Sequence, residues 1–188
     1  GRIEFCGQEV SLHSPSRALE LGIATVFQDL ALCENLDVVA NLFLGHELSP
    51  WNLDEVAMEV RAWTLLRELA ARIPSVREPI ASLSGGQRQT VAIARSLLLA
   101  PKIIMLDEPT AGLDPDRSQN FVELVGDLQR ELGLTVVMVT HDMREAFTLA
   151  TRVVAFERPR DRPEEKLRYG ATITRDIAIW PPRKAGEA

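Results

Sequence analysis

Four short apolar runs, separated by amphipathic stretches, restrict the folds open to this chain more than any other feature of its sequence. They cover residues 23–27, 103–106, 135–140 and 153–156. In the long stretches between them, apolar residues recur every three or four positions, as in helices that bury one face. Apolar strands that alternate with such helices are typical of a parallel sheet buried on both faces. The sequence therefore predicts an α/β fold.

Polar capping residues mark where a long predicted helix begins. Asn52 and Glu55 fit a capping box in front of it, and Pro74 ends it. Apolar residues at helical spacing form its predicted buried face, namely Val56, Val60, Trp63, Leu66, Leu69 and Ile73. The stretch from about residue 36 to 99 is almost entirely helical in this interpretation and forms a separate lobe.

Composition narrows the classes of partner. The 188 residues carry a formal net charge of -6, which gives no general attraction to nucleic acid or to an anionic membrane surface. No apolar run approaches the roughly 20 residues that span a bilayer. The two cysteines, Cys6 and Cys33, form no CxxC motif and are interpreted as reduced thiols of a cytoplasmic protein. Any membrane association is expected to come from binding another protein.

Two carboxylates, Asp107 and Glu108, directly follow the run 103–106. In α/β sheets the ligand binds beyond the carboxyl ends of the strands, so these acids are placed where a ligand would lie. Nucleotide hydrolysis needs one acid to hold Mg²⁺ and a second to orient or deprotonate the attacking water. Asp107 fits the first role and Glu108 the second. The alternative is two acids in a solvent-exposed loop.

The segment Leu83-Ser84-Gly85-Gly86-Gln87 stands at the start of another predicted helix. Ser84 and Gln87 fit a capping box, which a plain capped helix would also have. That alternative leaves the two glycines unexplained, because glycine costs about 1 kcal/mol inside a helix. A serine and two glycines at a helix N-terminus expose backbone N–H groups to an anion, so the segment is predicted to bind phosphate.

The order of these motifs along the chain resembles that of the ABC ATPases over about residues 1–156. Gln28 matches the Q-loop of that family, residues 83–87 match its signature, and Asp107-Glu108 match the end of its Walker B strand. Further along, Leu113-Asp114 match its D-loop and His141 its switch histidine. The resemblance implies ATP and Mg²⁺ as cofactors. It gives catalytic roles to Glu108 and His141, and Mg²⁺ binding to Asp107 and Gln28. The residues that it implies in nucleotide binding are Gln28, Ser84, Gly85, Gly86, Gln87 and Asp114.

The resemblance also implies an incomplete P-loop NTPase fold, RecA-like, in which a helical subdomain is inserted into a parallel sheet. Residues 1–35 are the first part of the ATPase core and 36–99 the helical subdomain with the signature. Residues 100–156 are the second part of the core, and 157–188 a C-terminal tail.

One family motif is absent from the 188 residues. ABC ATPases carry G-x-x-x-x-G-K-[ST], whose backbone and lysine hold the phosphates. The three lysines here, Lys102, Lys166 and Lys184, follow no glycine. We therefore expect a chain truncated before the Walker A loop, which needs that loop from another chain to bind ATP and Mg²⁺ and is inactive alone. The strand 103–106 is expected to lack a neighbour in the sheet.

Within the family, residues 1–110 resemble the ATPases of sugar importers. Toward the C-terminus, from residue 111, the sequence resembles the ATPases of nitrate, taurine and urea uptake, so the chain has the character of a composite.

The predicted function is therefore the ATP-binding and ATP-hydrolysing subunit of an importer for a small polar solute. Such a subunit works with a second cassette and docks on a permease at the inner face of the membrane, with residues 35–41 on the docking side. One alternative is a non-catalytic cassette or fragment that donates its signature to a complete partner. Another is a DNA-associated ABC ATPase, but only about 50 residues separate Gln28 from the signature, without sustained heptads.

Overall fold

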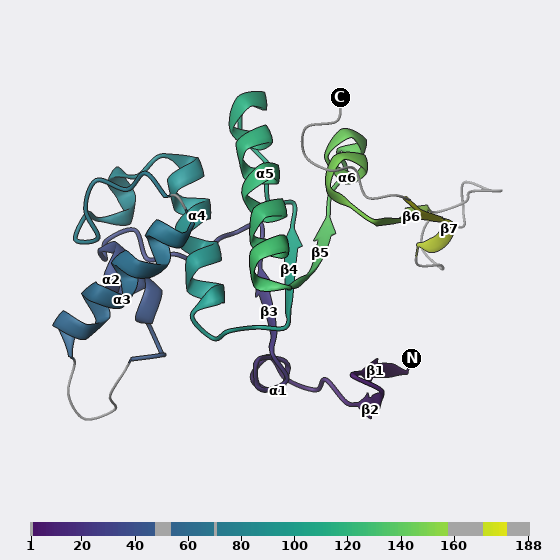
Figure 1. Ribbon diagram of the computed structural model, residues 1–188, viewed down its shortest axis with the longest axis horizontal. Coiled ribbons are helices and arrows are strands. Elements are labelled where there is room, and N and C mark those ends of the chain that lie inside the picture. The colour runs from purple at the N-terminus through teal and green to yellow at the C-terminus, as the bar shows by residue number, and fades with distance from the viewer. Residues whose placement is uncertain (1, 48–53, 70, 158–170, 180–188) are drawn as a thin grey trace, which may run out of the picture. The chain divides into compact units, whose positions relative to one another are not determined.

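The computed structural model describes residues 2–47, 54–69, 71–157 and 171–179 (Figure 1). The chain divides into two compact units, Gly1–Val139 and Thr140–Ala188. The predicted division into four parts rests on the family resemblance and stays a prediction.

Three parallel strands form the sheet of the first unit (Figure 1). They are β3 (Ile23–Val26), β4 (Ile103–Asp107) and β5 (Thr135–Val139), in the order β3-β4-β5. Val26 pairs with Leu106, and Asp107 pairs with Val139. The predicted parallel α/β arrangement of these three strands is confirmed.

The expectation that strand 103–106 lacks a neighbour is wrong. β4 is the central strand and pairs along its whole length with β5 and over Ile103–Leu106 with β3. The order of motifs along the sequence does not reveal the order of strands in space, because parallel neighbours are joined by long crossovers. Within the described residues, β3 and β5 are the edges of this sheet.

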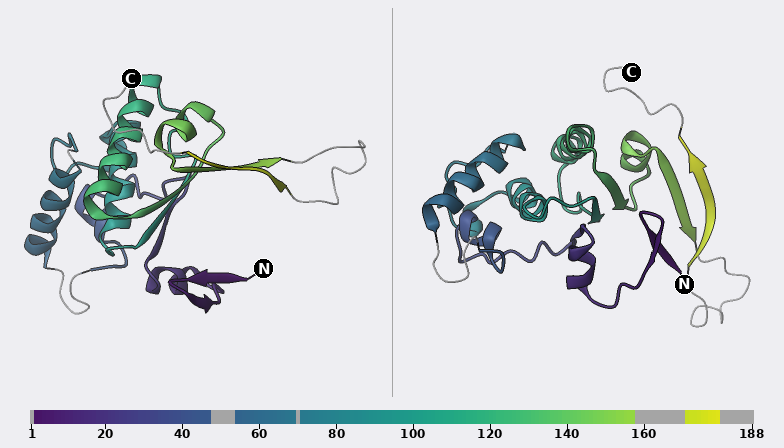
Figure 2. Two further views of the ribbon diagram at one scale, coloured as in Figure 1. Left: turned by 45° about the vertical axis from the view of Figure 1, so that its right-hand side comes forward. Right: turned by 60° about the horizontal axis from the view of Figure 1, so that its bottom comes forward.

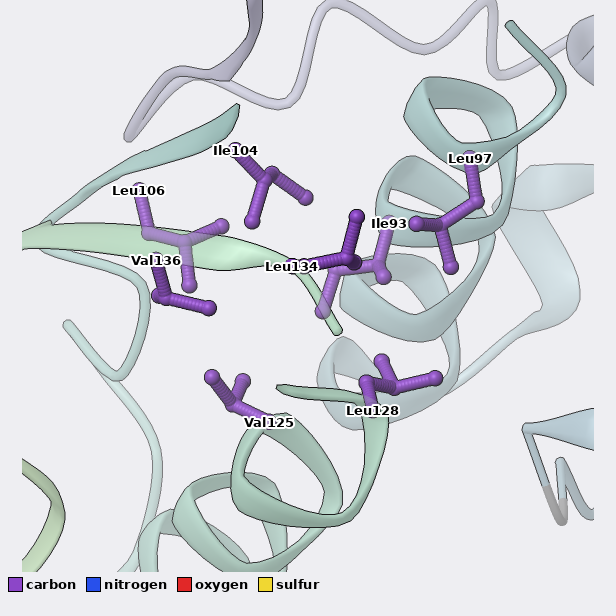
Figure 3. A pocket seen from close by; sticks show the side chains of 8 residues that line it. All are labelled: Ile93, Leu97, Ile104, Leu106, Val125, Leu128, Leu134 and Val136. Atoms are coloured by element: carbon purple, nitrogen blue, oxygen red, sulfur yellow. The ribbon is translucent and has the colours of Figure 1, made fainter. Parts of the chain in front are cut away.

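Two helices, α4 (Gly85–Leu97) and α5 (Pro115–Leu132), cover the same face of this sheet (Figure 2). Their apolar sides and the inward side chains of β4 and β5 meet in the buried core. Figure 3 shows the side chains around a small apolar cavity there, contributed by Ile93, Leu97, Ile104, Leu106, Val125, Leu128, Leu134 and Val136. Packing on this face accounts for the inward apolar side chains of β4 and β5, such as Leu106 and Val136.

The opposite face of the sheet remains partly exposed in the part of the chain that the structure describes. Met105 of β4 and Val137 of β5 have 39% and 42% of their surface exposed, and Val139 has 53%. The prediction that the strand 103–106 is buried on both faces is therefore wrong for this face. The burial along β4 alternates, as in a sheet covered on one side.

Shorter elements flank this core. The first unit begins with the antiparallel pair β1 (Ile3–Phe5) and β2 (Gln8–Val10), followed by helix α1 (Pro15–Glu20). The helical lobe holds α2 (Val38–Phe43), α3 (Glu55–Glu68) and the 3-10 turn η1 (Ile80–Ser82).

The buried face of α3 agrees with the predicted one at Leu66 and differs from it at Val56 and Val60. Val56 and Val60 are 75% and 61% exposed, whereas Met58, Ala62, Leu65 and Leu66 are buried. Both sets have helical spacing, and tertiary packing decides between them. The N-cap is Asp54, which accepts a hydrogen bond from Ala57 N at 3.0 Å. The predicted cap, Asn52, lies outside the described residues.

The second unit contains α6 (Met143–Leu149), β6 (Arg152–Glu157) and β7 (Thr172–Ala178). The predicted strand 153–156 lies within β6, but its partner β7 is antiparallel rather than parallel. Arg152 pairs with Asp176 across the two strands, N–O 2.6 Å. This hydrogen bond holds the pKa of Asp176 below its ordinary value.

Asn41 of α2 fixes the segment that connects β3 to α2. Its side chain is fully buried. Its Oδ1 accepts from Cys33 N at 2.7 Å, and its Nδ2 donates to the carbonyl oxygens of Cys33, Leu36 and Asp37 at 3.0, 3.2 and 2.9 Å. The prediction that residues 35–41 face a permease therefore does not hold for the Asn41 side chain, which is not accessible.

Ala100 offers a test of local strain after α4. It has φ 45, in the left-handed region that favours glycine, and its N–H donates to Leu97 O at 2.9 Å. Ala100→Gly is expected to raise the free energy of unfolding by about 0.5–1 kcal/mol, because glycine relieves this strain. Urea denaturation measures the change. Ala57→Gly, within α3, is the control and should lower it by about 0.5–1 kcal/mol; a loss at both positions would contradict the prediction.

Candidate functional site

Three predicted site residues lie at the carboxyl-terminal edge of the sheet. Val26 of β3 and Leu106 of β4 are paired on adjacent parallel strands. Gln28 lies two residues after Val26, and Glu108 lies two residues after Leu106. Asp107 is the last residue of β4. Ligands of open parallel sheets bind at this edge. The structure thus brings Gln28 to the same edge as Asp107 and Glu108.

The backbone of Glu108 has an unusual conformation. Its φ is 45, which is rare for a residue with a long side chain. The Glu108 N–H donates to Val139 O at the end of β5 at 2.8 Å, and its carbonyl accepts from Ala111 N at 3.0 Å. Strained backbone of this kind persists where the surroundings over-determine it, and it is frequent at functional sites. Sequence reasoning identified the carboxylate but not this strain.

Asp114 caps the helix that follows. Its Oδ1 accepts from Arg117 N at 3.0 Å, and its Oδ2 lies 3.0 Å from Arg117 Nε. An aspartate directly before Pro115 predicts such an N-cap, and Gly133 predicts the end of this helix; both are confirmed, and Gly133 has φ 64. The role of Asp114 at a nucleotide stays a prediction.

The capping box at the signature is also confirmed. Ser84 N donates to Gln87 Oε1 at 2.9 Å, and Gln87 N donates to Ser84 Oγ at 3.4 Å. The other end of the Gln87 amide donates to Arg72 O at 2.6 Å. Both ends of the Gln87 side chain are therefore bonded within this chain. Ser84 is exposed at the N-terminus of α4, next to the two glycines.

Neither glycine of the signature is required by the packing of this chain. A Cβ atom at Gly85 would meet only Leu113 Cδ2, at 3.8 Å, and one at Gly86 would meet nothing within 4 Å. Both residues are helical, and neither has the positive φ that favours glycine. Glycine is otherwise used where a ligand or another backbone approaches closely. Contacts within this chain therefore do not require glycine at either position.

His141 belongs to the second unit, two residues beyond the end of β5 in the sequence. It is exposed, and Asp142 after it caps α6 by accepting from Arg144 N at 2.7 Å. Its predicted catalytic role stays a prediction.

The oxygen atoms of Asp107 and Gln28 at the sheet edge suit Mg²⁺, which takes few ligands from protein, better than a metal that is bound by protein side chains alone. The described residues contain no group of three or more His, Cys, Asp or Glu side chains placed to hold a metal. Mg²⁺ needs one or two carboxylates and takes its other ligands from phosphates and water. Asp107, half-buried at the end of β4, can supply the carboxylate, and Gln28 can supply an amide oxygen.

Sequence reasoning also missed Gln89. This residue of α4 is only 8% exposed, and its side chain contacts the backbone directly after Glu108. A signal was present, because Gln89 lies four residues before buried Ile93, on the apolar face of the helix.

Solved structures identify the class of this fold. The ATP-binding cassette MJ0796, solved as a dimer bound to ADP and Pi, matches with a TM-score of 0.65 and 28% sequence identity, over 82% of this chain and 68% of that one. The fold is therefore that of the P-loop NTPases, in the form of an ATP-binding cassette. In the described part of the chain, no helix combines the length and apolar character needed to cross a bilayer.

The family profile described as ABC transporter matches residues 1–111. The chain belongs to the ABC transporter family, as its motifs predicted. It is 38% identical over 162 residues to the fructose import ATP-binding protein FrcA of Rhizobium meliloti, covering 81% of this chain and 62% of FrcA. It is 37% identical over 159 residues to the xylose/arabinose import ATP-binding protein XylG of Sulfolobus acidocaldarius, covering 84% and 63%.

These relatives confirm the likeness to sugar-import ATP-binding proteins. The chain spans about three fifths of the length of each of them. The likeness of the C-terminal part to nitrate, taurine and urea uptake stays a prediction.

Proposed function

We propose that this chain is an ATP-binding subunit of an importer for a small polar solute and that it contributes the signature half of an ATP site shared with a second cassette. The observation that carries the proposal is the pair of signature glycines, for which the packing of this chain gives no reason. A phosphate group approaching the N-terminus of α4 would give one, since a Cβ atom there would stand in its way.

The shape of the signature supports binding in trans. The N-terminus of a 13-residue helix favours an anion through its dipole and its free N–H groups. Ser84 is exposed beside them and can donate its hydroxyl to a phosphate oxygen. The similar cassette MJ0796 forms a dimer bound to ADP and Pi, so a second cassette is the natural source of the nucleotide.

The residues of the first unit that we assign to the other half-site are Gln28, Asp107 and Glu108, and the family resemblance adds a role for His141 of the second unit. Bound Mg²⁺ would neutralise phosphate charge and take Asp107, with Gln28, as protein ligands. Glu108 would orient or deprotonate the attacking water, and His141 would contact the γ-phosphate. The phosphate-binding lysine would come from a polypeptide segment outside the 188 residues, because Lys102, Lys166 and Lys184 follow no glycine.

The remaining partner is a permease. Relatives named for the import of fructose and of xylose/arabinose support docking of this subunit on a transmembrane permease at the cytoplasmic face of the membrane. The exposed Asn35, unlike buried Asn41, is available to such a contact.

The 188-residue chain, purified alone, is expected to hydrolyse no ATP above background. The reason is that neither the chain nor a second copy offers a lysine in a phosphate-binding loop. Phosphate release from Mg²⁺-ATP is measured for the wild type and for Glu108→Gln, which are expected to give the same background rate. Turnover that Glu108→Gln abolishes would contradict the proposal, because it would show a complete site within these residues.

A further inference from the structure

Gln89 connects the signature helix to the residues that carry the two carboxylates. It is the fifth residue of α4, and its Nε2 donates to Pro109 O at 2.5 Å, across 20 positions of sequence. Pro109 is buried and directly follows Glu108. A buried glutamine is uncommon. Here its donor reaches the backbone of the carboxylate loop, which we define as residues 107–110.

The other end of the same amide shows that glutamine is not favoured at this position by packing. The Oε1 atom of Gln89 is buried and has no hydrogen-bond partner among the described residues. A buried acceptor without a partner is unfavourable, and an apolar side chain of similar size would avoid that cost. Packing alone would therefore favour an apolar side chain at this position. What glutamine adds over such a side chain is the hydrogen bond to Pro109 O.

The carboxylate loop is held from two sides. On one side Glu108 N donates to Val139 O of β5, and on the other Pro109 O accepts from Gln89 of α4. Further along, Leu113 lies against the first turn of α4, with its Cδ2 3.8 Å from the Cβ position of Gly85. The left-handed conformation of Glu108 therefore depends on contacts with β5 and with the signature helix.

We infer that Gln89 is a positioning residue that ties the carboxylate loop to the signature helix. The inference rests on the proposed function for its meaning: α4 would present Ser84 to the nucleotide of a second cassette, while the loop presents Glu108 to its own half-site. A shift of α4 on nucleotide binding would then be passed to Glu108 through the Gln89–Pro109 bond. One chain would in this way couple the two ATP sites of a dimer.

Amide hydrogen exchange of the 188-residue chain tests this role without nucleotide or partner. Gln89→Met keeps the length of the side chain and removes the donor. Protection of the Glu108 and Ala111 amides, which bond to Val139 O and Glu108 O, is expected to fall about tenfold. The urea midpoint of global unfolding should stay near that of the wild type, since the buried orphan acceptor is removed as well.

Ser96→Ala is the matched control. Ser96 lies on the same helix, is 9% exposed, and donates to Ile93 O at 2.7 Å within that helix. Its loss should leave the Glu108 and Ala111 amides unchanged. Gln89→Leu, which also removes the donor, should lower their protection as Gln89→Met does. Unchanged protection in both Gln89 variants, or an equal loss in Ser96→Ala, would overturn the inference; because no ATP is present, that result would leave the proposed function untouched.

Discussion

Ser84→Arg is expected to abolish the ability of this chain to support ATP hydrolysis by a complete cassette, whereas Glu108→Gln changes it little. Ser84 stands at the N-terminus of α4, where the proposed function places a phosphate of the partner's nucleotide. An arginine side chain there fills the phosphate position. Glu108 serves the other half-site, which has no phosphate-binding lysine within these residues. The two variants therefore act on different ATP sites of the dimer.

The assay needs a partner cassette whose own homodimer does not hydrolyse ATP. A complete cassette of the FrcA type, with the serine of its signature replaced by arginine, keeps its phosphate loop but cannot complete a site in its partner. Phosphate release then depends on the signature of the added chain. The wild type is expected to restore hydrolysis, Ser84→Arg to leave it at the level of the partner alone, and Glu108→Gln to stay within about twofold of the wild type, because that group makes no transition-state contact in this site.

Ser82→Arg controls for the added charge. Ser82 is exposed in η1, two residues before Ser84, and its hydroxyl donates to Glu78 rather than lying at a helix N-terminus. This variant should restore hydrolysis as the wild type does. If Glu108→Gln abolished the restored activity while Ser84→Arg preserved it, binding in trans would be refuted. Restoration by none of the variants, the wild type included, would leave the chain without the proposed activity.

Features set by a few neighbouring residues were predictable from the sequence. The capping box of Ser84 and Gln87 and the cap of α5 at Asp114 depend on hydrogen bonds over three positions, and both occur as predicted. The end of α5 at Gly133 depends on one φ angle. Such local signals fixed the positions of the motifs, and with them the edge of the sheet at which Asp107 and Glu108 lie.

Features set by contacts between distant residues were not predictable in the same way. The pairing of β4 with both β3 and β5 joins segments that are 80 and 32 residues apart in the sequence at Ile23↔Ile103↔Thr135. The choice of Met58 over Val56 for the buried face of α3 depends on packing, since both fit helical spacing. The strain at Glu108 follows from its bond to Val139, which no local pattern reveals.

Asn41→Leu is expected to lower the free energy of unfolding by about 3–5 kcal/mol, a large share of the stability of a domain of this size. Leucine is similar in volume and suits a fully buried site. It removes all four hydrogen bonds of the Asn41 side chain, and leaves Cys33 N and the carbonyl oxygens of Cys33, Leu36 and Asp37 without that partner. The three carbonyl oxygens keep a backbone donor each, namely Leu36 N, Ile80 N and Asn41 N, so the cost comes from the four lost bonds and from Cys33 N, which loses its acceptor.

The control for this substitution lies in the same segment. Asn35 is exposed, so Asn35→Leu should change the free energy of unfolding by no more than about 0.5 kcal/mol. Asn41→Asp separates the two sets of bonds, because it keeps the acceptor for Cys33 N but loses the donor to the three carbonyls. Its urea midpoint should fall nearly as far as that of Asn41→Leu, since three of the four bonds come from that donor. A change at Asn41 no larger than at Asn35 would mean that the segment between β3 and α2 is held by its backbone contacts to residues 76–81 instead.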